Sequence, residues 1–188
     1  MTAGDLVRHV AFLRGINVGG HKPVKMADLR TAFLAMGFRN VKTVLASGNV
    51  LVDWLPEAGL PESAFDLTVH MEQCLRKTFG HSIAVTLRTL RDLQCLVGSD
   101  PFEGVAMTPD TRLYVTFVSD ARTGGRDFTY AAPEGDLRIT RVTSGELCSV
   151  LVLSPTRSTT DLMALLEREL GSGITTRNWN TIIKMVQE

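Results

Sequence analysis

The sequence predicts an α+β fold that contains two similar units, one after the other. Hydrophobic runs typical of strands alternate with segments in which apolar residues recur every three or four positions, as in helices. In the first half the order is strand, helix, strand, strand, helix, strand, and the strands return in the same order in the second half. A Ser-Gly pair joins the two middle strands both times, at 47–48 and at 144–145. We therefore expect two ferredoxin-like units of the βαββαβ type.

The elements of the first unit follow from local patterns. Residues 7–13 are rich in β-formers and predict a buried strand. A helix is expected from Met26 because Met26, Leu29 and Phe33 share one helical face, and Gly37 is placed to end it. Strands at 41–46 and 49–52 enclose the Ser-Gly turn, a helix covers 62–79, and the last strand covers 83–87.

The second unit repeats this plan with one difference. Strands are predicted at 112–118, 137–142, 146–153 and 174–176, with helices at 159–170 and 179–186. Between 119 and 136 glycine, proline and charged residues prevail without a clear helical pattern. The second unit therefore lacks or shortens its first helix and gains a C-terminal helix. We expect the units to be 1–98 and 99–188, with a short linking helix near the boundary.

The composition argues against nucleic-acid-binding, secreted and membrane proteins. The chain has 188 residues, 44% of them hydrophobic, and its 20 Lys and Arg balance its 20 Asp and Glu. Nucleic-acid binders usually carry a basic excess, so nucleic acid is an unlikely partner. The three cysteines form no paired motif and the N-terminus resembles no signal peptide, so we expect a cytoplasmic protein. No apolar run approaches membrane-spanning length, so we expect no membrane association.

The loop after the first strand is the main candidate site. It reads Leu-Arg-Gly-Ile-Asn-Val-Gly-Gly-His-Lys at 13–22. The glycine spacing is that of a P-loop, but the Lys is one place late and no Ser or Thr follows, so a P-loop nucleotide hydrolase is improbable. Successive amides in such a turn still form an anion-binding concavity. The predicted ligand residues of this loop and the following helix start are Arg14, Asn17, Gly19, Gly20, Lys22 and Lys25.

Two further segments carry candidate ligands. Asn49 follows the Ser-Gly turn, whose glycine is already explained by the hairpin. Arg177 and Asn178 precede the last helix and Trp179 begins it; Arg177 and Asn178 would bind a polar ligand and Trp179 would stack on it. Capping by Asn178 and packing of Trp179 is the alternative interpretation, and it is the better supported one. If both segments belong to one site, they must meet the first loop in space.

No reaction can be assigned from the residues. There is no nucleophile motif, and His9 and His70 fall within regular elements, which leaves His21 as the one acid–base candidate. No histidine or cysteine pair has an evident metal-ligand spacing, so no metal site is expected. Whether the protein is an enzyme is open, and its cofactor is unknown.

Taken together, several motifs resemble a known family. Leu-Arg-Gly-Ile-Asn-Val-Gly-Gly at 13–20, Lys-Met at 25–26, Ser-Gly-Asn-Val at 47–50 and Thr-Thr-Arg-Asn-Trp-Asn-Thr at 175–181 are similar to the bacterial family called domain of unknown function 1697. Ala46 stands where that family usually has Gln. The resemblance implies paired ferredoxin-like units and brings no established activity, cofactor or catalytic residue.

Three functions remain open at this stage. The first is a site for a small anionic or polar ligand, binding or enzymatic, at the glycine-rich loop. The second is a nucleic-acid module on an open sheet, for which Phe12 and Tyr114 are the aromatic candidates. The third is a homodimeric interaction module that pairs through edge strands.

Overall fold

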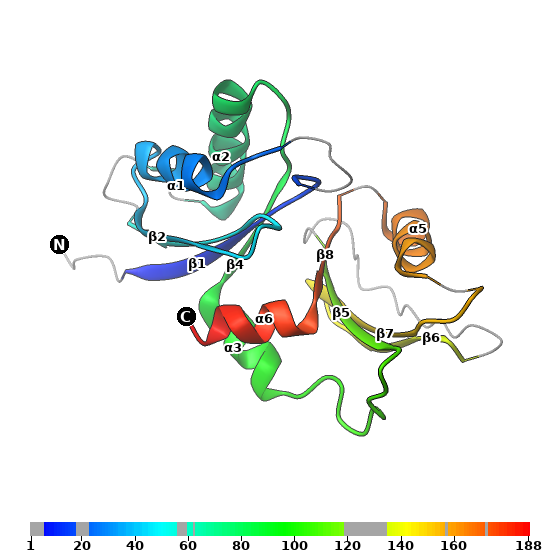
Figure 1. The fold of residues 1–188 in the computed structure, drawn as a ribbon. Coiled ribbons are helices and arrows are strands. Elements are labelled where there is room, and N and C mark those ends of the chain that lie inside the picture. Colours follow the sequence, from blue (N-terminus) through cyan, green and yellow to red (C-terminus); the bar gives the residue numbers. More distant parts are fainter. Residues whose placement is uncertain are drawn as a thin grey trace. The chain divides into compact units, whose positions relative to one another are not determined.

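The computed structural model describes residues 6–17, 23–55, 60–61, 63–118, 135–156, 158–171 and 173–188. Contacts divide the chain into two compact units, Met1–Gln94 and Cys95–Glu188. The helix α3 (Leu90–Gly98) runs across this division (Figure 1). The predicted boundary after residue 98 falls at the end of that helix. The division into domains 1–98 and 99–188 stays a prediction.

The first unit is a four-stranded antiparallel sheet with two helices. Its elements are β1 (Val7–Leu13), α1 (Met26–Ala35), β2 (Arg39–Val44), β3 (Asn49–Trp54), α2 (Ala64–Phe79) and β4 (Val85–Thr89). The strand order is β2-β3-β1-β4. Both helices lie on one face of this sheet (Figure 1).

Capping residues account for the extent of α2. The Ser63 hydroxyl accepts a hydrogen bond from the Asp66 amide at 3.0 Å, which satisfies a free donor of the first turn. At the other end Gly80 adopts φ +76° and its amide bonds to the Arg76 carbonyl. Glycine ends a helix in this left-handed conformation without the steric penalty of a side chain.

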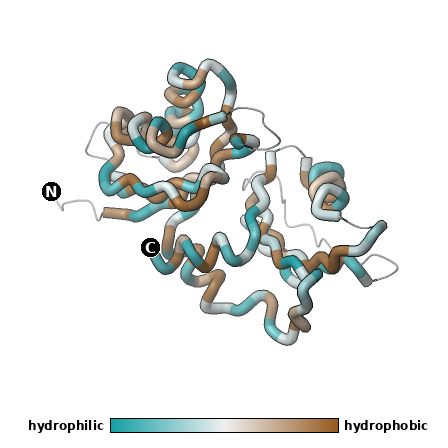
Figure 2. The backbone as a smooth tube through the Cα atoms, in the orientation of Figure 1, coloured by the Kyte–Doolittle hydropathy of each residue, from teal (hydrophilic) through white to brown (hydrophobic). Residues whose placement is uncertain are grey.

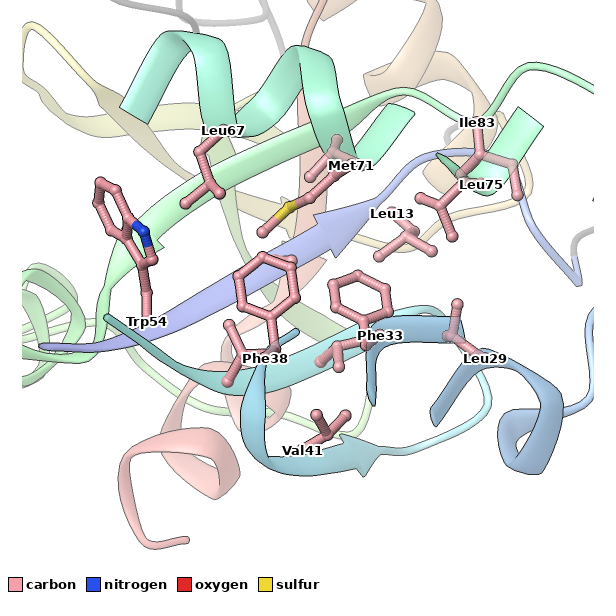
Figure 3. Packing of buried hydrophobic residues seen from close by; sticks show 14 of the residues in the cluster. Leu13, Leu29, Phe33, Phe38, Val41, Trp54, Leu67, Met71, Leu75 and Ile83 are labelled. Atoms are coloured by element: carbon pink, nitrogen blue, oxygen red, sulfur yellow. The ribbon is translucent and has the colours of Figure 1, made fainter. Parts of the chain in front are cut away.

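The first core lies between the helices and the sheet (Figure 3). Successive strand residues point to opposite faces, so β3 sends Val50, Val52 and Trp54 toward the helices. The helices contribute Phe33 from α1 and Met71 from α2 to the same cluster. Along the tube in Figure 2, hydrophobic and hydrophilic stretches alternate, as expected for antiparallel strands and helices that bury one face.

The second unit repeats the topology. Its elements are β5 (Thr111–Phe117), β6 (Leu137–Val142), β7 (Glu146–Val152), α5 (Thr159–Leu170), β8 (Thr175–Asn178) and α6 (Trp179–Val186). The strand order β6-β7-β5-β8 is that of the first sheet, position for position. The predicted fold class of two ferredoxin-like units is confirmed. The connection 119–134, where the first helix was expected to be short or missing, lies outside the described residues.

Two helices pack on the second sheet. Leu162 and Leu166 of α5 join Leu147 and Leu151 of β7 in one core. The helix α6 contacts β5 instead, and its first residue, Trp179, makes an edge-to-face contact with Phe102 at 5.1 Å between ring centroids. Among the described residues no helix is long and apolar enough to cross a membrane.

The duplication extends to single hydrogen bonds. In the first unit the Leu13 amide, at the end of β1, donates to the Gly48 carbonyl in the β2–β3 turn at 2.7 Å. In the second unit the Val118 amide, just after β5, donates to the Gly145 carbonyl in the β6–β7 turn at 2.9 Å. The repeated Ser-Gly pair therefore marks equivalent positions, where a turn is tied to the end of a central strand.

Strand ends differ from the predicted ends by a few residues. The strand expected at 41–46 is β2, which ends at Val44 because Leu45 adopts φ +59°, outside the strand region. The turn is therefore the four residues 45–48, not Ser-Gly alone. The expected strands at 83–87 and 174–176 begin and end two residues or fewer later, as β4 and β8.

A histidine is buried in the first unit. His9 of β1 is 5% exposed, its Nδ1 donates to the Val7 carbonyl at 3.0 Å, and its ring contacts Trp54 edge-to-face. Burial lowers the pKa of His9, and the Val7 hydrogen bond and the charge of Asp92 offset this only in part. The folded protein therefore holds His9 neutral to a lower pH than the unfolded chain does.

This burial makes stability depend on pH. Below the unfolded pKa of about 6.5, His9 binds a proton in the unfolded chain but remains neutral in the folded protein. We expect the free energy of unfolding to fall as the pH drops below about 6.5, until the lowered folded pKa is passed. Urea denaturation between pH 7 and 5 measures this slope. The His9→Gln variant should show a shallower slope, and an unchanged slope would contradict the assignment to His9.

Candidate functional site

The loop that follows β1 meets the β2–β3 turn at one corner of the first unit. The Leu13 amide donates to Gly48, and the next amide, that of Arg14, donates to the Ala84 carbonyl before β4 at 2.9 Å. The end of β1 is thus held on both sides. The two sequence motifs of the first half, separated by some thirty residues, are brought together here.

Gly48 lets the loop approach the turn closely. A Cβ at Gly48 would lie 2.8 Å from Cδ1 and 2.9 Å from Cγ1 of Ile16, and 3.0 Å from Cβ of Leu13. Ile16 and Leu13 are each 1% exposed, so neither can move aside easily. Gly48 also has φ +76°. Both its backbone conformation and its surroundings therefore require glycine.

Asn17 closes the loop. Its Nδ2 donates to the carbonyls of Val24 and Ala46, both at 2.9 Å, and its Oδ1 accepts the Val24 amide at 2.8 Å. One side chain thus joins the two ends of the 17–24 loop and ties both to the β2–β3 turn. Asn17 has φ +56°, a conformation that Asn tolerates better than most residues. The contact at Ala46 uses only the backbone, so it needs no particular side chain there.

Three consecutive amides of the loop differ from their neighbours. Among the described residues, the N–H groups of Gly15, Ile16 and Asn17 donate to no protein acceptor, whereas those of Leu13, Arg14 and Val24 do. Gly15 has φ +68°. Left-handed residues within a short turn make neighbouring amides converge, and such a concavity binds anions. Gly15 and Asn17 are exposed, so a ligand could reach this turn.

Cationic side chains lie at both ends of the loop. Arg14 is partly exposed next to Gly15, and the exposed Lys25 follows Val24, which Asn17 holds. Lys25 is also the N-cap of α1, where no side chain caps the first turn. The positive end of the helix dipole therefore faces this end of the loop, although Asp28 of the first turn reduces its effect. The predicted ligands Gly19, Gly20 and Lys22, and His21, lie outside the described residues.

Asn49 stabilises the β2–β3 turn. It is fully buried, and its Nδ2 donates to the Val44 carbonyl at 2.9 Å and to the Ser47 hydroxyl at 3.0 Å. These bonds join the first residue of β3 to the last residue of β2 and to the third residue of the turn. Its predicted contact with a ligand stays a prediction, and the turn geometry explains the residue without one.

The segment at the end of β8 is largely committed to packing and capping. The Asn178 side chain caps α6 by accepting the Asn180 amide at 3.0 Å, and Trp179 is 8% exposed against Phe102. Arg177 donates to the Thr176 carbonyl at 2.9 Å, and burial lowers the pKa of its guanidinium to about 10. These three residues belong to the second unit and Arg14 to the first, so a site shared between them remains a prediction.

Some residues of the corner were not identified from the sequence. Ile16 and Val24 were assigned no role, yet Ile16 fills the space above Gly48 and Val24 is the anchor for Asn17. Two apolar residues within a polar, glycine-rich loop are the signal that was available. They indicate that the ends of the loop pack onto the domain.

Comparison with known proteins identifies the family. The family model for a protein of unknown function (DUF1697) matches residues 6–147. The chain belongs to the DUF1697 family. The match includes the whole corner and ends before the 175–181 segment. No curated protein matches the chain.

A solved structure extends the likeness of this DUF1697 protein to nearly the full chain. It is that of a conserved bacterial protein from Streptococcus pneumoniae, with a TM-score of 0.69 and 21% sequence identity. The alignment covers 97% of this chain and 98% of that one. At 21% sequence identity, this similarity shows a shared fold only.

The close approach at Gly48 can be tested with a matched glycine. Gly80 has the same φ, +76°, but a Cβ there meets nothing within 4 Å. Gly80→Ala should cost about 1–2 kcal/mol from backbone conformation alone. Gly48→Ala should cost about 1–3 kcal/mol more because the methyl group overpacks the corner. Urea denaturation of both variants measures the difference, and equal losses would contradict the packing argument.

The role of Asn17 can be separated from its backbone conformation. Asn17→Gly keeps the left-handed φ accessible but removes three hydrogen bonds. We expect a loss of about 2 kcal/mol in the free energy of unfolding and faster hydrogen exchange at the Val24 amide. If exchange at Val24 is unaltered, Asn17 does not hold the loop.

Proposed function

We propose that the corner formed by the β1–α1 loop binds a small anion, such as a phosphate or carboxylate group of a larger ligand. One observation carries the proposal: the amides of Gly15, Ile16 and Asn17 have no acceptor among the described residues, although the amides on either side of them do. Exposed neighbouring amides that no protein group engages can converge on an external acceptor. An anion would supply the acceptor.

The surrounding charges support an anion over a neutral ligand. The guanidinium of Arg14 can bind phosphate or carboxylate with two parallel hydrogen bonds, and Lys25 adds a second cation. Asn17 and Gly48 hold the turn in one conformation before any ligand arrives. Such preorganisation lowers the entropic cost of binding. Whether the bound molecule also reacts is left open by these residues.

The nucleic-acid alternative receives no support from its two aromatic candidates. Phe12 is fully buried. The Tyr114 hydroxyl bonds to Thr159 at 3.0 Å and its ring packs against the α5 core. Neither ring is presented on an open sheet, where single-stranded RNA would stack. A homodimer stays a separate prediction.

Titration with inorganic phosphate tests the anion site. We expect the amide resonances of Gly15, Ile16 and Asn17 to shift progressively in a ¹⁵N correlation spectrum, and the melting temperature to rise with phosphate concentration. Arg14→Ala should weaken both effects about tenfold or more, since a hydrogen bond to a charged group contributes about 1.5–3 kcal/mol.

Arg168→Ala is the matched control. Arg168 is exposed on α5, pairs with Glu169 and lies in the second unit, so its replacement changes the net charge equally and leaves every residue of the corner in place. This variant should bind phosphate like the unaltered protein. Equal weakening in both variants, or shifts spread over the surface, would show general screening and contradict a site at the loop.

A further inference from the structure

The helix α2 places a thiol and an imidazole side by side, and neither is among the residues of the corner. Cys74 Sγ lies 3.7 Å from His70 Nε2. The two residues are one turn apart, so their side chains project from the same face of the helix. Both are partly exposed, beside the buried stripe that Leu67, Met71 and Leu75 form.

The distance between Cys74 Sγ and His70 Nε2 is close to the separation of two atoms that bind the same metal ion. Zinc–sulfur and zinc–nitrogen bonds are about 2.3 Å and about 2.0 Å long, and the ligands of a tetrahedral ion subtend about 109°. Two such ligands lie about 3.5 Å apart. The separation of 3.7 Å between Cys74 Sγ and His70 Nε2 is close to this value, so an ion could bind with only a small adjustment of the side chains.

Among the described residues, neither the Cys74 thiol nor the His70 imidazole forms a hydrogen bond or ion pair with a third residue. There, the one hydrogen-bond-type contact of the His70 ring and of the Cys74 thiol is with each other. The backbone beneath them is firm, because the Thr78 hydroxyl bonds to the Cys74 carbonyl at 2.9 Å and both ends of α2 are capped. A soft thiolate combined with an imidazole favours zinc over magnesium or calcium.

We propose that His70 and Cys74 form a two-residue binding site for Zn²⁺ on the surface of α2. On binding, the Cys74 thiol releases its proton to solvent and a zinc–sulfur bond forms, while the neutral His70 donates the Nε2 lone pair. No third His, Cys, Asp or Glu completes a cluster among the described residues. Water fills the remaining positions, so the site binds more weakly than a four-ligand structural site.

Cobalt(II) serves as the spectroscopic probe because it replaces zinc and its thiolate complexes absorb in the near ultraviolet. Adding Co²⁺ to the reduced protein should produce a thiolate-to-cobalt band that saturates near one equivalent and disappears when Zn²⁺ is added. The band should be absent in Cys74→Ser and weakened at least tenfold in apparent affinity in His70→Gln. Both positions are on a helix surface, and circular dichroism confirms that each variant is folded.

Cys95→Ser is the matched control. Cys95 is also on a helix and more exposed, and no imidazole contacts it among the described residues. Its removal should leave the cobalt band unaltered. The third thiol, Cys148, is buried, and burial raises its pKa to about 12, so it stays protonated and does not compete. A band that survives Cys74→Ser, a band unaffected by His70→Gln, or no band with cobalt in excess would each overturn the proposal.

Discussion

The corner of the first unit depends on the side chain of Asn17. Its three hydrogen bonds join the start of the glycine-rich loop to its end and both to the β2–β3 turn. A loop of this length loses considerable conformational entropy when its ends are fixed. Asn supplies a donor and an acceptor on one short side chain and also tolerates a left-handed backbone. Few other residues could close the loop in this way.

The second support of the corner is the lack of a side chain at Gly48. The Ile16 side chain occupies the space that a Cβ would take, and the Gly48 carbonyl receives the Leu13 amide. The equivalent bond from Val118 to Gly145 recurs in the second unit. Tying the middle turn to the end of a central strand is therefore a property of the duplicated fold. The proposed anion-binding function belongs to the β1–α1 loop of the first unit, whose ends Asn17 joins.

The residues of the family motifs divide into two groups by their contacts. Asn17, Gly48, Asn49, Asn178 and Trp179 are engaged in hydrogen bonds, close packing or capping within their own unit. Gly15, Arg14 and Lys25 have exposed or partly exposed positions around amides for which the described part of the chain supplies no acceptor. The first group shapes the corner. The second group would recognise the ligand under the proposed function, because its cations lie beside amides that can converge on an anion.

The sequence by itself determined the class of fold and the order of its elements. Apolar periodicity and glycine positions are local properties, so β1, α1, α5 and α6 could be located within a residue or two. The position of the candidate loop was also predictable, because clustered glycines and cations are visible in the chain. The roles of Asn178 in capping and of Trp179 in packing followed from their places just before and at the start of a helix.

Only the tertiary structure decided which residues of the loop are scaffold and which are available. The contact of Asn17 with Ala46 and the packing of Ile16 on Gly48 join segments about thirty residues apart, and no local pattern encodes such pairs. The pairing of His70 with Cys74 needed the side-chain rotamers as well as the helical spacing. Contacts that depend on chain folding at long range are set by the packing of the whole unit, and that is why they could not be read from the residues in order.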